Sequence, residues 1–154
     1  MLRAGPHEQP TTDFIFSDGA AAMVISPSPL YPSENSVMYA NDSSHINDLK
    51  NEWGGPYNHG AGLSMNGAEV HAFVLRTVPD LIRRYTETVT KCDVLVQHQA
   101  NLAMMKSVER LSGFAGPSLH CIQRTGNMSL VSIPAAIALN EEQALGKLLL
   151  LCGY

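Results

Sequence analysis

The spacing of apolar residues predicts alternating helices and strands in the second half of the chain. Over residues 67–88, apolar side chains recur every three or four positions, which is typical of a helix with one buried face. The apolar run 94–96 then predicts a short buried strand. Helical spacing resumes after Asn101 and stops near Gly113. These residues therefore predict a strand placed between two amphipathic helices.

The same alternation continues to the end of the sequence. Residues 118–122 predict another short strand, and residues 132–146 predict a helix with Ser132 as its N-cap. Residues 148–151 are apolar on both faces, as in a central strand. This order predicts an α/β fold with a mostly parallel sheet and helices on both of its faces.

The first half gives weaker signals. Residues 14–16 and 22–25 are β-like runs separated by Ser-Asp-Gly, so they predict an antiparallel hairpin that makes the sheet mixed. Residues 36–40 predict a third strand. Residues 41–64 are rich in Asn, Ser, Gly and His, which indicates a long loop, either a binding lid or an ordinary excursion.

Composition favours one globular domain. The chain has 154 residues, of which 45% are hydrophobic and 16% charged, so we expect a single domain over 1–154 with residues 1–12 as a loose tail. No apolar run is long enough to span a bilayer, and the first ten residues lack a signal-peptide core. The net charge of −4 argues against a nucleic-acid surface. These features predict a cytoplasmic location.

Cysteine and histidine spacing gives no metal motif. Cys92, Cys121 and Cys152 are odd in number and far apart, so we expect free and mostly buried thiols. His98, His120 and Cys121 lack the tight pairs that zinc sites use, and we therefore expect no metal.

Two polar residues fall in turns just past predicted strands. His98 comes after residues 94–96, and Asn127 comes in the turn after residues 118–122. If these strands are neighbours, both side chains can reach one carbonyl oxygen and stabilise negative charge that develops on it. The alternative is structural: His98 caps the following helix and Asn127 holds a left-handed turn.

Four sequence blocks appear in a recognisable order. They read FSDGAAAMV at 16–24, MNGAEV at 65–70, HQAN at 98–101 and GNMSLVSIP at 126–134. From about Phe14 to Tyr154 the chain resembles the carboxyl-terminal half of a β-ketoacyl-acyl-carrier-protein synthase III, of the thiolase-like superfamily. The resemblance implies a five-layered αβαβα fold made of two similar halves, normally as a homodimer. It also implies that the family's last strand lies beyond Tyr154.

This resemblance implies a Cys-His-Asn active site without a cofactor. The cysteine accepts an acyl group from acyl-CoA, and the histidine and asparagine hold the thioester carbonyl of malonyl-carrier-protein during decarboxylation. By motif position, His98 and Asn127 match that histidine and asparagine. Gly67 and Asn101 match positions near the pantetheine arm of the substrate.

Two departures qualify the expected activity. The family's nucleophilic cysteine belongs to the amino-terminal half, and no cysteine of this chain matches it. Ala103 stands where many members have an arginine that contacts the carrier protein. We therefore expect the chain alone to be inactive. It is either part of a condensing enzyme, a partner subunit of a split acyltransferase, or a non-catalytic interaction module. An isolated half would expose apolar surface on the helices around Leu102 or Ile133 and associate.

Overall fold

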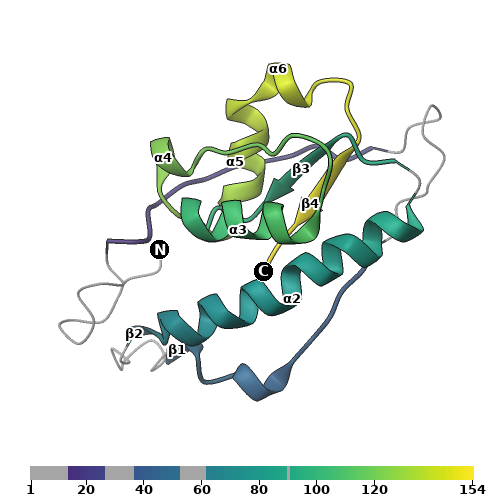
Figure 1. The fold of residues 1–154 in the computed structure, drawn as a ribbon. Coiled ribbons are helices and arrows are strands. Elements are labelled where there is room, and N and C mark those ends of the chain that lie inside the picture. The colour runs from purple at the N-terminus through teal and green to yellow at the C-terminus, as the bar shows by residue number, and fades with distance from the viewer. Residues whose placement is uncertain (1–13, 27–36, 53–61, 90) are drawn as a thin grey trace.

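The computed structural model describes residues 14–26, 37–52, 62–89 and 91–154 (Figure 1). The predicted tail, 1–12, lies outside these residues. Along the chain the elements are η1 (Ser43–His45), β1 (Leu49–Glu52), β2 (Gly62–Met65), α2 (Gly67–Thr88), β3 (Val94–Gln97), α3 (Leu102–Ser112), α4 (Ile122–Thr125), η2 (Ser129–Val131), α5 (Ser132–Leu139), α6 (Glu141–Ala144) and β4 (Leu149–Cys152).

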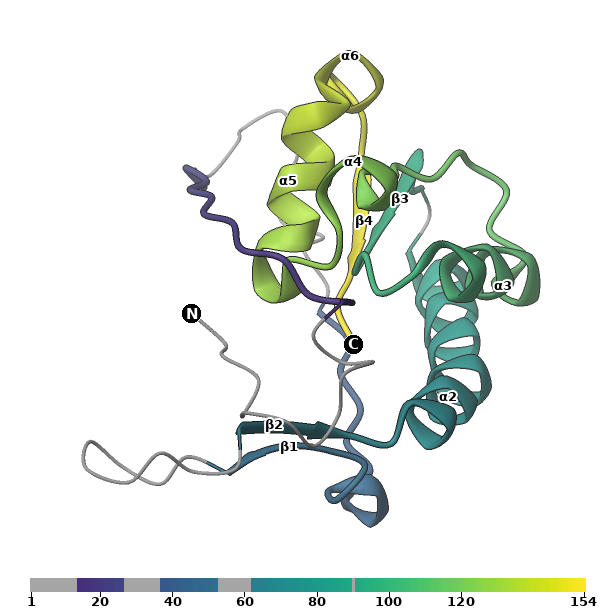
Figure 2. The ribbon, with the colours of Figure 1, turned by 90° about the vertical axis from the view of Figure 1, so that its left-hand side faces the viewer.

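The centre of the fold is the parallel pair β3–β4. Its register runs from Val94 opposite Leu149 to Gln97 opposite Cys152. Figure 2 shows α2 and α3 on one side of this pair and α5 on the other. The predicted parallel pairing and the predicted helices on both faces are therefore confirmed for this part of the chain.

Alternate residues of the two strands supply two separate cores. Leu95 and Leu150 face α2 and α3, whereas Val94, Val96 and Leu149 face α5 and α6. The helices complete the first core with Val74, Val78, Ile82, Met104 and Val108. The second core is completed by Leu119, Cys121, Ala136 and Ala144. Both faces of the pair are covered, which explains why the strands are apolar throughout.

Helix α2 has the predicted bounds and packs against α3. Its N-cap is Asn66, whose side chain accepts a hydrogen bond from the backbone N–H of Glu69. Pro79 lies inside the helix and is buried. The helix continues past it to Thr88, and four of its residues, all on the face toward the core, are buried: Val74, Val78, Pro79 and Ile82.

Helix α3 also matches its prediction, and both of its ends have clear causes. The Asn101 Oδ1 atom accepts a hydrogen bond of 2.8 Å from the Met104 N–H, which caps the first turn. Gly113 ends the helix in the left-handed conformation, with φ at 69°. The structural alternative in which His98 caps this helix is therefore wrong.

The prediction of one mixed sheet is wrong in the described residues. Strands β1 and β2 form their own antiparallel sheet, with Leu49 opposite Met65, and make no pairing with β3 or β4. Apart from Met65, both strands fall inside residues 41–64, which the sequence predicted to be a long loop. Residues 53–61 lie outside the described part of the chain. The polar and small residues of these strands give no alternating apolar pattern that could indicate a strand. The pairing continues at Asn66, directly before α2, where the Asn66 N–H donates to Asp48 O at 2.7 Å.

The predicted hairpin of residues 14–16 and 22–25 does not form. Phe16 instead makes a single parallel bridge with Asn127. The Asn127 N–H donates to Ile15 O at 3.2 Å, and the Ser17 N–H donates to Asn127 O at 2.9 Å. A distant partner thus takes the backbone groups that a local hairpin would need. Residues 22–25 and the described part of the predicted third strand, 37–40, are not strands.

Two further predictions need correction near the carboxyl end. Residues 118–122 supply only a bridge between Ser118 and Leu95, and α4 begins at Ile122. The predicted helix 132–146 splits into α5 and α6 at Asn140, whose side-chain amide donates to Ala136 O at 2.8 Å and to His120 O at 3.2 Å. Ser132 is not an N-cap, because it begins α5 with no side-chain cap bond.

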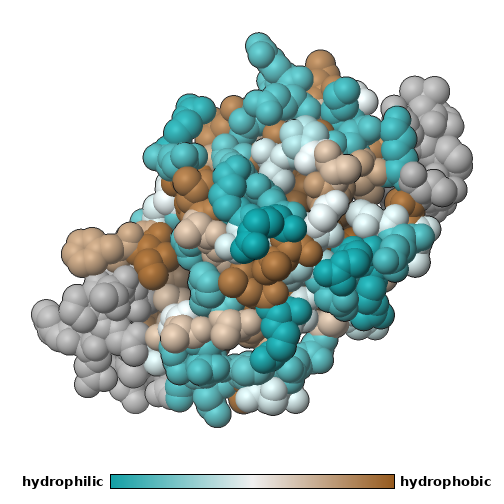
Figure 3. Space-filling view, in the orientation of Figure 1, coloured by the Kyte–Doolittle hydropathy of each residue, from teal (hydrophilic) through white to brown (hydrophobic). Residues whose placement is uncertain are grey.

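The surface of the described residues mixes polar and apolar areas (Figure 3). The most exposed large apolar side chains are Phe14, Val24, Ile25, Val37, Tyr39 and Leu130. Leu102 and Ile133, named above as part of an associating surface, are only half-exposed. None of the helices in the described ranges is long and apolar enough to cross a membrane.

Candidate functional site

All four predicted site residues line one cavity. It has a volume of about 350 Å³, and its wall includes Gly67, His98, Asn101 and Asn127. Apolar side chains make up most of the remaining wall: Ile15, Phe16, Leu49, Met65, Val70, Val74, Ala100, Met104, Leu130 and Ile133. The other lining residues are His71, Ser129, Gly153 and Tyr154. An apolar cavity with a few convergent polar groups is typical of a ligand site.

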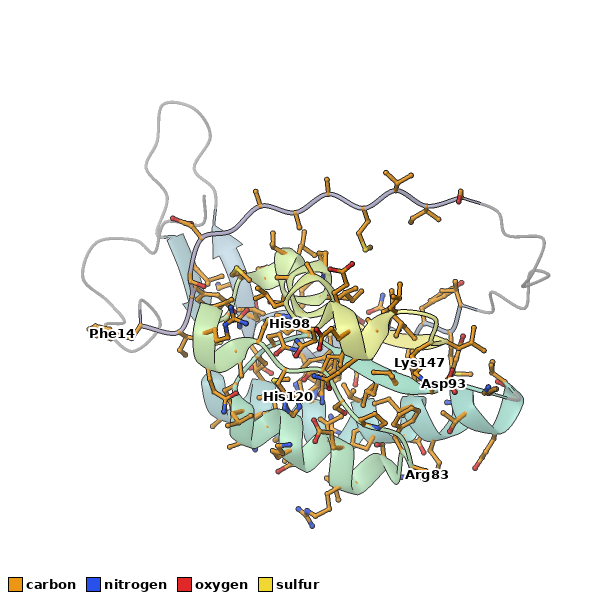
Figure 4. The ribbon with its side chains drawn as sticks, turned by 90° about the horizontal axis from the view of Figure 1, so that it is seen from above. Phe14, Arg83, Asp93, His98, His120 and Lys147 are labelled. Carbon is orange, nitrogen blue, oxygen red and sulfur yellow. The ribbon has the colours of Figure 1, made fainter. Side chains whose placement is uncertain are left out.

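The β3–β4 pair places His98 at this cavity. The His98 N–H donates to Cys152 O at 2.8 Å, which extends the strand ladder by one step. The His98 carbonyl then accepts from the Ala100 N–H at 3.1 Å, so the chain turns at once toward α3. Figure 4 shows His98 near the centre of the molecule, whereas Phe14 projects at its edge.

Burial keeps the His98 imidazole neutral near pH 7. Desolvation lowers the pKa of His98 below its usual 6.5, and a hydrogen bond to the backbone of Ser129 opposes this effect. Because that contact favours the charged ring, the acceptor is the Ser129 carbonyl oxygen. A neutral imidazole has one N–H donor and one lone pair, so His98 can donate a hydrogen bond without bearing a positive charge.

Asn127 is fixed on three sides and still presents a free donor. Ile15 and Ser17 hold its backbone, and its Oδ1 accepts from the Ser129 N–H at 2.9 Å. A backbone N–H needs an acceptor, so this contact fixes the orientation of the carboxamide. Among the described residues the Asn127 Nδ2 atom has no hydrogen-bond partner, and the residue lines the cavity. It is available as a donor at the cavity.

The peptide groups of Ser129 connect the two candidate residues. The Ser129 N–H binds Asn127 and its carbonyl binds the His98 ring. Ser129 has a φ of 52°, the only positive value among the described non-glycine residues, and such a conformation costs about 1–2 kcal/mol. The structural alternative for Asn127 is thus partly confirmed, since its side chain does hold a left-handed turn. The same turn brings Asn127 to His98.

Gly67 and Asn101 contact the cavity in different ways. Gly67 is the first residue of α2, and a Cβ added there would meet only the Met65 Cε atom, at 4.0 Å. The Asn101 Oδ1 is occupied by the α3 cap, as described above. The predicted contact of both residues with a pantetheine arm stays a prediction.

None of the three cysteines lines this cavity, and all three are free thiols. Cys121 is buried in the core beside α5. Burial raises the pKa of Cys152 to about 11 and also raises the pKa of Cys92. Thiols of high pKa are poor nucleophiles at neutral pH, because the thiolate is the reactive form. The described chain therefore offers the cavity the side chains of His98 and Asn127 as hydrogen-bond donors, and no nucleophilic cysteine.

Sequence reasoning missed three lining residues. His71 follows Gly67 by four residues, so helical spacing could have placed it on the same face of α2. His98 follows β3 directly and Tyr154 lies two residues after β4, so parallel pairing could have indicated their proximity. Ser129 had no comparable signal, because its role depends on its backbone conformation.

Known proteins that resemble this chain in sequence share one description. No protein-family model matches the chain. It is 31% identical over 167 residues to β-ketoacyl-[acyl-carrier-protein] synthase III 2 of Deinococcus radiodurans, which covers 93% of this chain and 46% of that protein. It is also 31% identical over 133 residues to the synthase III of Oceanobacillus iheyensis, with coverages of 83% and 41%. The chain thus spans a little under half the length of these relatives.

A similar solved structure agrees with this result. The synthase III of Thermus thermophilus matches with a TM-score of 0.62 and 25% identity, over 75% of this chain and 40% of that one. The predicted fold class, an α/β thiolase-like half, is therefore confirmed, with the correction that β1 and β2 form a separate small sheet.

Proposed function

Because this chain belongs to the β-ketoacyl-acyl-carrier-protein synthase III family, we propose that it is the carboxyl-terminal part of a condensing enzyme. The proposed reaction is the decarboxylative condensation of an acyl thioester with a malonyl thioester, in fatty acid or polyketide synthesis. This chain would supply the groups that activate the malonyl thioester.

One observation supports the proposal most strongly. His98 and Asn127 come from distant parts of the sequence, and the Ser129 backbone connects them at the wall of one cavity. The proposed role of both is to donate hydrogen bonds to the thioester carbonyl oxygen, the His98 ring through its N–H and Asn127 through Nδ2. Asn127 is held in place before the reaction and needs no reorganisation, whereas the His98 N–H exchanges the Ser129 carbonyl for the substrate oxygen.

The chemistry follows from this arrangement. When the bond to the malonyl carboxylate breaks, CO₂ leaves and the electron pair moves toward the thioester carbonyl. The oxygen becomes an enolate oxyanion, and the two donors stabilise it. The enolate carbon then attacks the acyl group held on a cysteine and displaces its thiolate. The apolar wall of the cavity strengthens both hydrogen bonds by excluding water.

The neutral state of His98 suits this role. In the free protein its N–H points to the backbone of Ser129, so the substrate oxygen has to replace that acceptor. A protonated ring would bind the anion more strongly, but it would also risk donating its proton to the enolate. The lowered pKa keeps the ring as a donor with no extra proton at neutral pH.

Substrates and partners are part of the proposal. Acyl-CoA would be the acyl donor, and malonyl-carrier-protein would be the second substrate. Ala103 is exposed near the start of α3, where a carrier-binding arginine is absent, so a CoA thioester is an alternative second substrate. The complete enzyme would be a homo-oligomer.

The nucleophile has to come from another part of the complete enzyme. The positions and raised pKa values of this chain's cysteines support this view. They also leave room for the alternative of a partner subunit of a split acyltransferase, or of a non-catalytic interaction module. These hypotheses predict different reactions of the purified chain with an acyl thioester and with a malonyl thioester.

Two measurements on the purified chain test the proposal. With acyl-CoA, intact-mass spectrometry should find no acyl adduct on Cys92, Cys121 or Cys152. The chain alone should not condense two thioesters, but with malonyl-pantetheine it should release CO₂ faster than buffer does, because oxyanion donors retain part of a catalytic effect without the nucleophile. A stable acyl-cysteine would contradict the assigned absence of a nucleophile. CO₂ release no faster than in buffer would favour the non-catalytic alternative.

A further inference from the structure

A buried amide lies directly behind the His98 wall of the cavity. Gln97, the last residue of β3, is fully buried and uses every polar atom of its side chain. Its Nε2 donates to Met105 O at 3.3 Å and to the Glu109 Oε1 atom at 3.1 Å. Those two acceptors fix the orientation of the amide, so its Oε1 needs a donor on the other side.

Tyr154 supplies that donor. Its hydroxyl donates to the Gln97 Oε1 at 3.0 Å, and the His98 carbonyl lies 3.3 Å away as a second acceptor. The Tyr154 ring meets the His98 imidazole edge to face, with centroids 5.5 Å apart and an angle of 84° between the planes. The hydroxyl is thus anchored in the core while the ring covers the imidazole.

We propose that Tyr154 is a positioning residue for His98, and that the buried amide of Gln97 holds it in place through its hydroxyl. The proposal rests on the proposed function only in taking His98 as the group that needs a fixed orientation. Tyr154 itself lines the cavity, so it also limits how far the imidazole can turn.

Glu109 extends this anchor to the surface. Its Oε1 accepts from Gln97 and also lies 2.5 Å from the His120 Nε2 atom, while its Oε2 lies 3.4 Å from Lys106 Nζ. Gln97 therefore has a charged, well-bonded acceptor behind it, which resists rotation of the amide. Burial raises the pKa of Tyr154, so its hydroxyl remains a donor over the whole neutral range.

Few ionisable groups act on the His98 ring. Tyr154, two residues after β4, packs on it, and His71 lines the same cavity from α2. The pKa of His98 is lowered by burial, with the Ser129 backbone opposing, and no charged side chain adds to these causes. Losing the cover of Tyr154 would hydrate the ring and favour its charged form. The titration midpoint of His98 would then rise toward 6.5.

The test is a titration of the His98 ring signals by NMR in the whole chain, without substrate. In the Tyr154→Phe variant the ring remains but its anchor is lost, so we expect the His98 midpoint to rise and its signals to broaden. Gln97→Met, which keeps the volume and removes the amide, should give the same rise. Since both changes remove the same hydrogen bond between Tyr154 and Gln97, the His98 midpoint in the double variant should rise no further than in either single variant.

A matched control is Tyr85→Phe, because Tyr85 lies on α2 and does not line this cavity. It should leave the His98 midpoint unchanged. An unchanged midpoint in folded Tyr154→Phe would overturn the proposal, as would additive shifts in the double variant. CO₂ release by the unsubstituted chain tests the proposed function separately, so the positioning role and that function can fail independently.

Discussion

Replacing His98 or Asn127 with alanine should lower the release of CO₂ from malonyl-pantetheine by about 100- to 1,000-fold, provided the chain's rate exceeds that of buffer by more than this. Loss of one oxyanion donor has an effect of this size in enzymes that stabilise a developing negative charge. Both side chains line one cavity and are connected through Ser129, so neither can replace the other.

The measurement is the rate at which labelled CO₂ leaves the malonyl carboxylate, followed for each variant under saturating thioester. His71→Ala is the matched control, because His71 lines the same cavity from α2 and is not part of the turn that connects His98 with Asn127. It should retain a rate within a few-fold of the unsubstituted chain. An equal loss in all three variants would mean that the cavity matters and the pair does not.

Gly116→Ala should be strongly destabilising, lowering the free energy of unfolding by about 3 kcal/mol. A Cβ at this position would lie 2.3 Å from the Asp93 carbonyl oxygen and 2.7 Å from the Phe114 Cε1 atom. Asp93 cannot move away easily, because its N–H donates to Leu148 O at 2.8 Å and its Oδ2 accepts from the Leu148 N–H at 2.9 Å.

Urea unfolding of Gly113→Ala provides the comparison. Gly113 has a φ of 69°, but a Cβ there would meet no atom within 4 Å. That variant should lose only the cost of a left-handed alanine, about 1–2 kcal/mol. A loss in Gly116→Ala no larger than the loss in Gly113→Ala would contradict the prediction, because it would show that the chain relieves the close approach of the Asp93 carbonyl oxygen.

The elements that the sequence predicted best have a regular spacing of apolar residues and clear signals at their ends. Helix α2 repeats its apolar face over many turns, and α3 has Asn101 before it and Gly113 after it. Strands β3 and β4 are buried on both faces, so continuous apolar runs were a sufficient signal. In these cases local sequence and tertiary packing favour the same structure.

The wrong predictions concern elements whose structure depends on residues far away in the sequence. Phe16 pairs with Asn127, more than a hundred residues away, and no local pattern could indicate that bridge. The β1–β2 hairpin has too few apolar residues to show alternation. Asn140 breaks a helical run because its side chain finds the Ala136 and His120 carbonyls, and only the folded chain brings the second one near.

The candidate site likewise has one part that the sequence predicted and another that it did not. His98 and Asn127 could be predicted because each follows a predicted strand, and the sequence blocks around them resemble a known family. What holds them together could not be predicted. The Ser129 turn depends on a positive φ, and the Tyr154 contact depends on the register of β3 and β4. Both are properties of the fold.

The central claim, that His98 and Asn127 bind the same thioester oxygen, is tested most directly by infrared spectroscopy. The measured quantity is the carbonyl stretching frequency of a ¹³C-labelled acetyl-pantetheine thioester bound to the chain. We expect a frequency below that of the thioester in an apolar solvent, with a partial return in His98→Ala and in Asn127→Ala and a full return in the double variant. A bound thioester whose frequency is the same in all four proteins would contradict it.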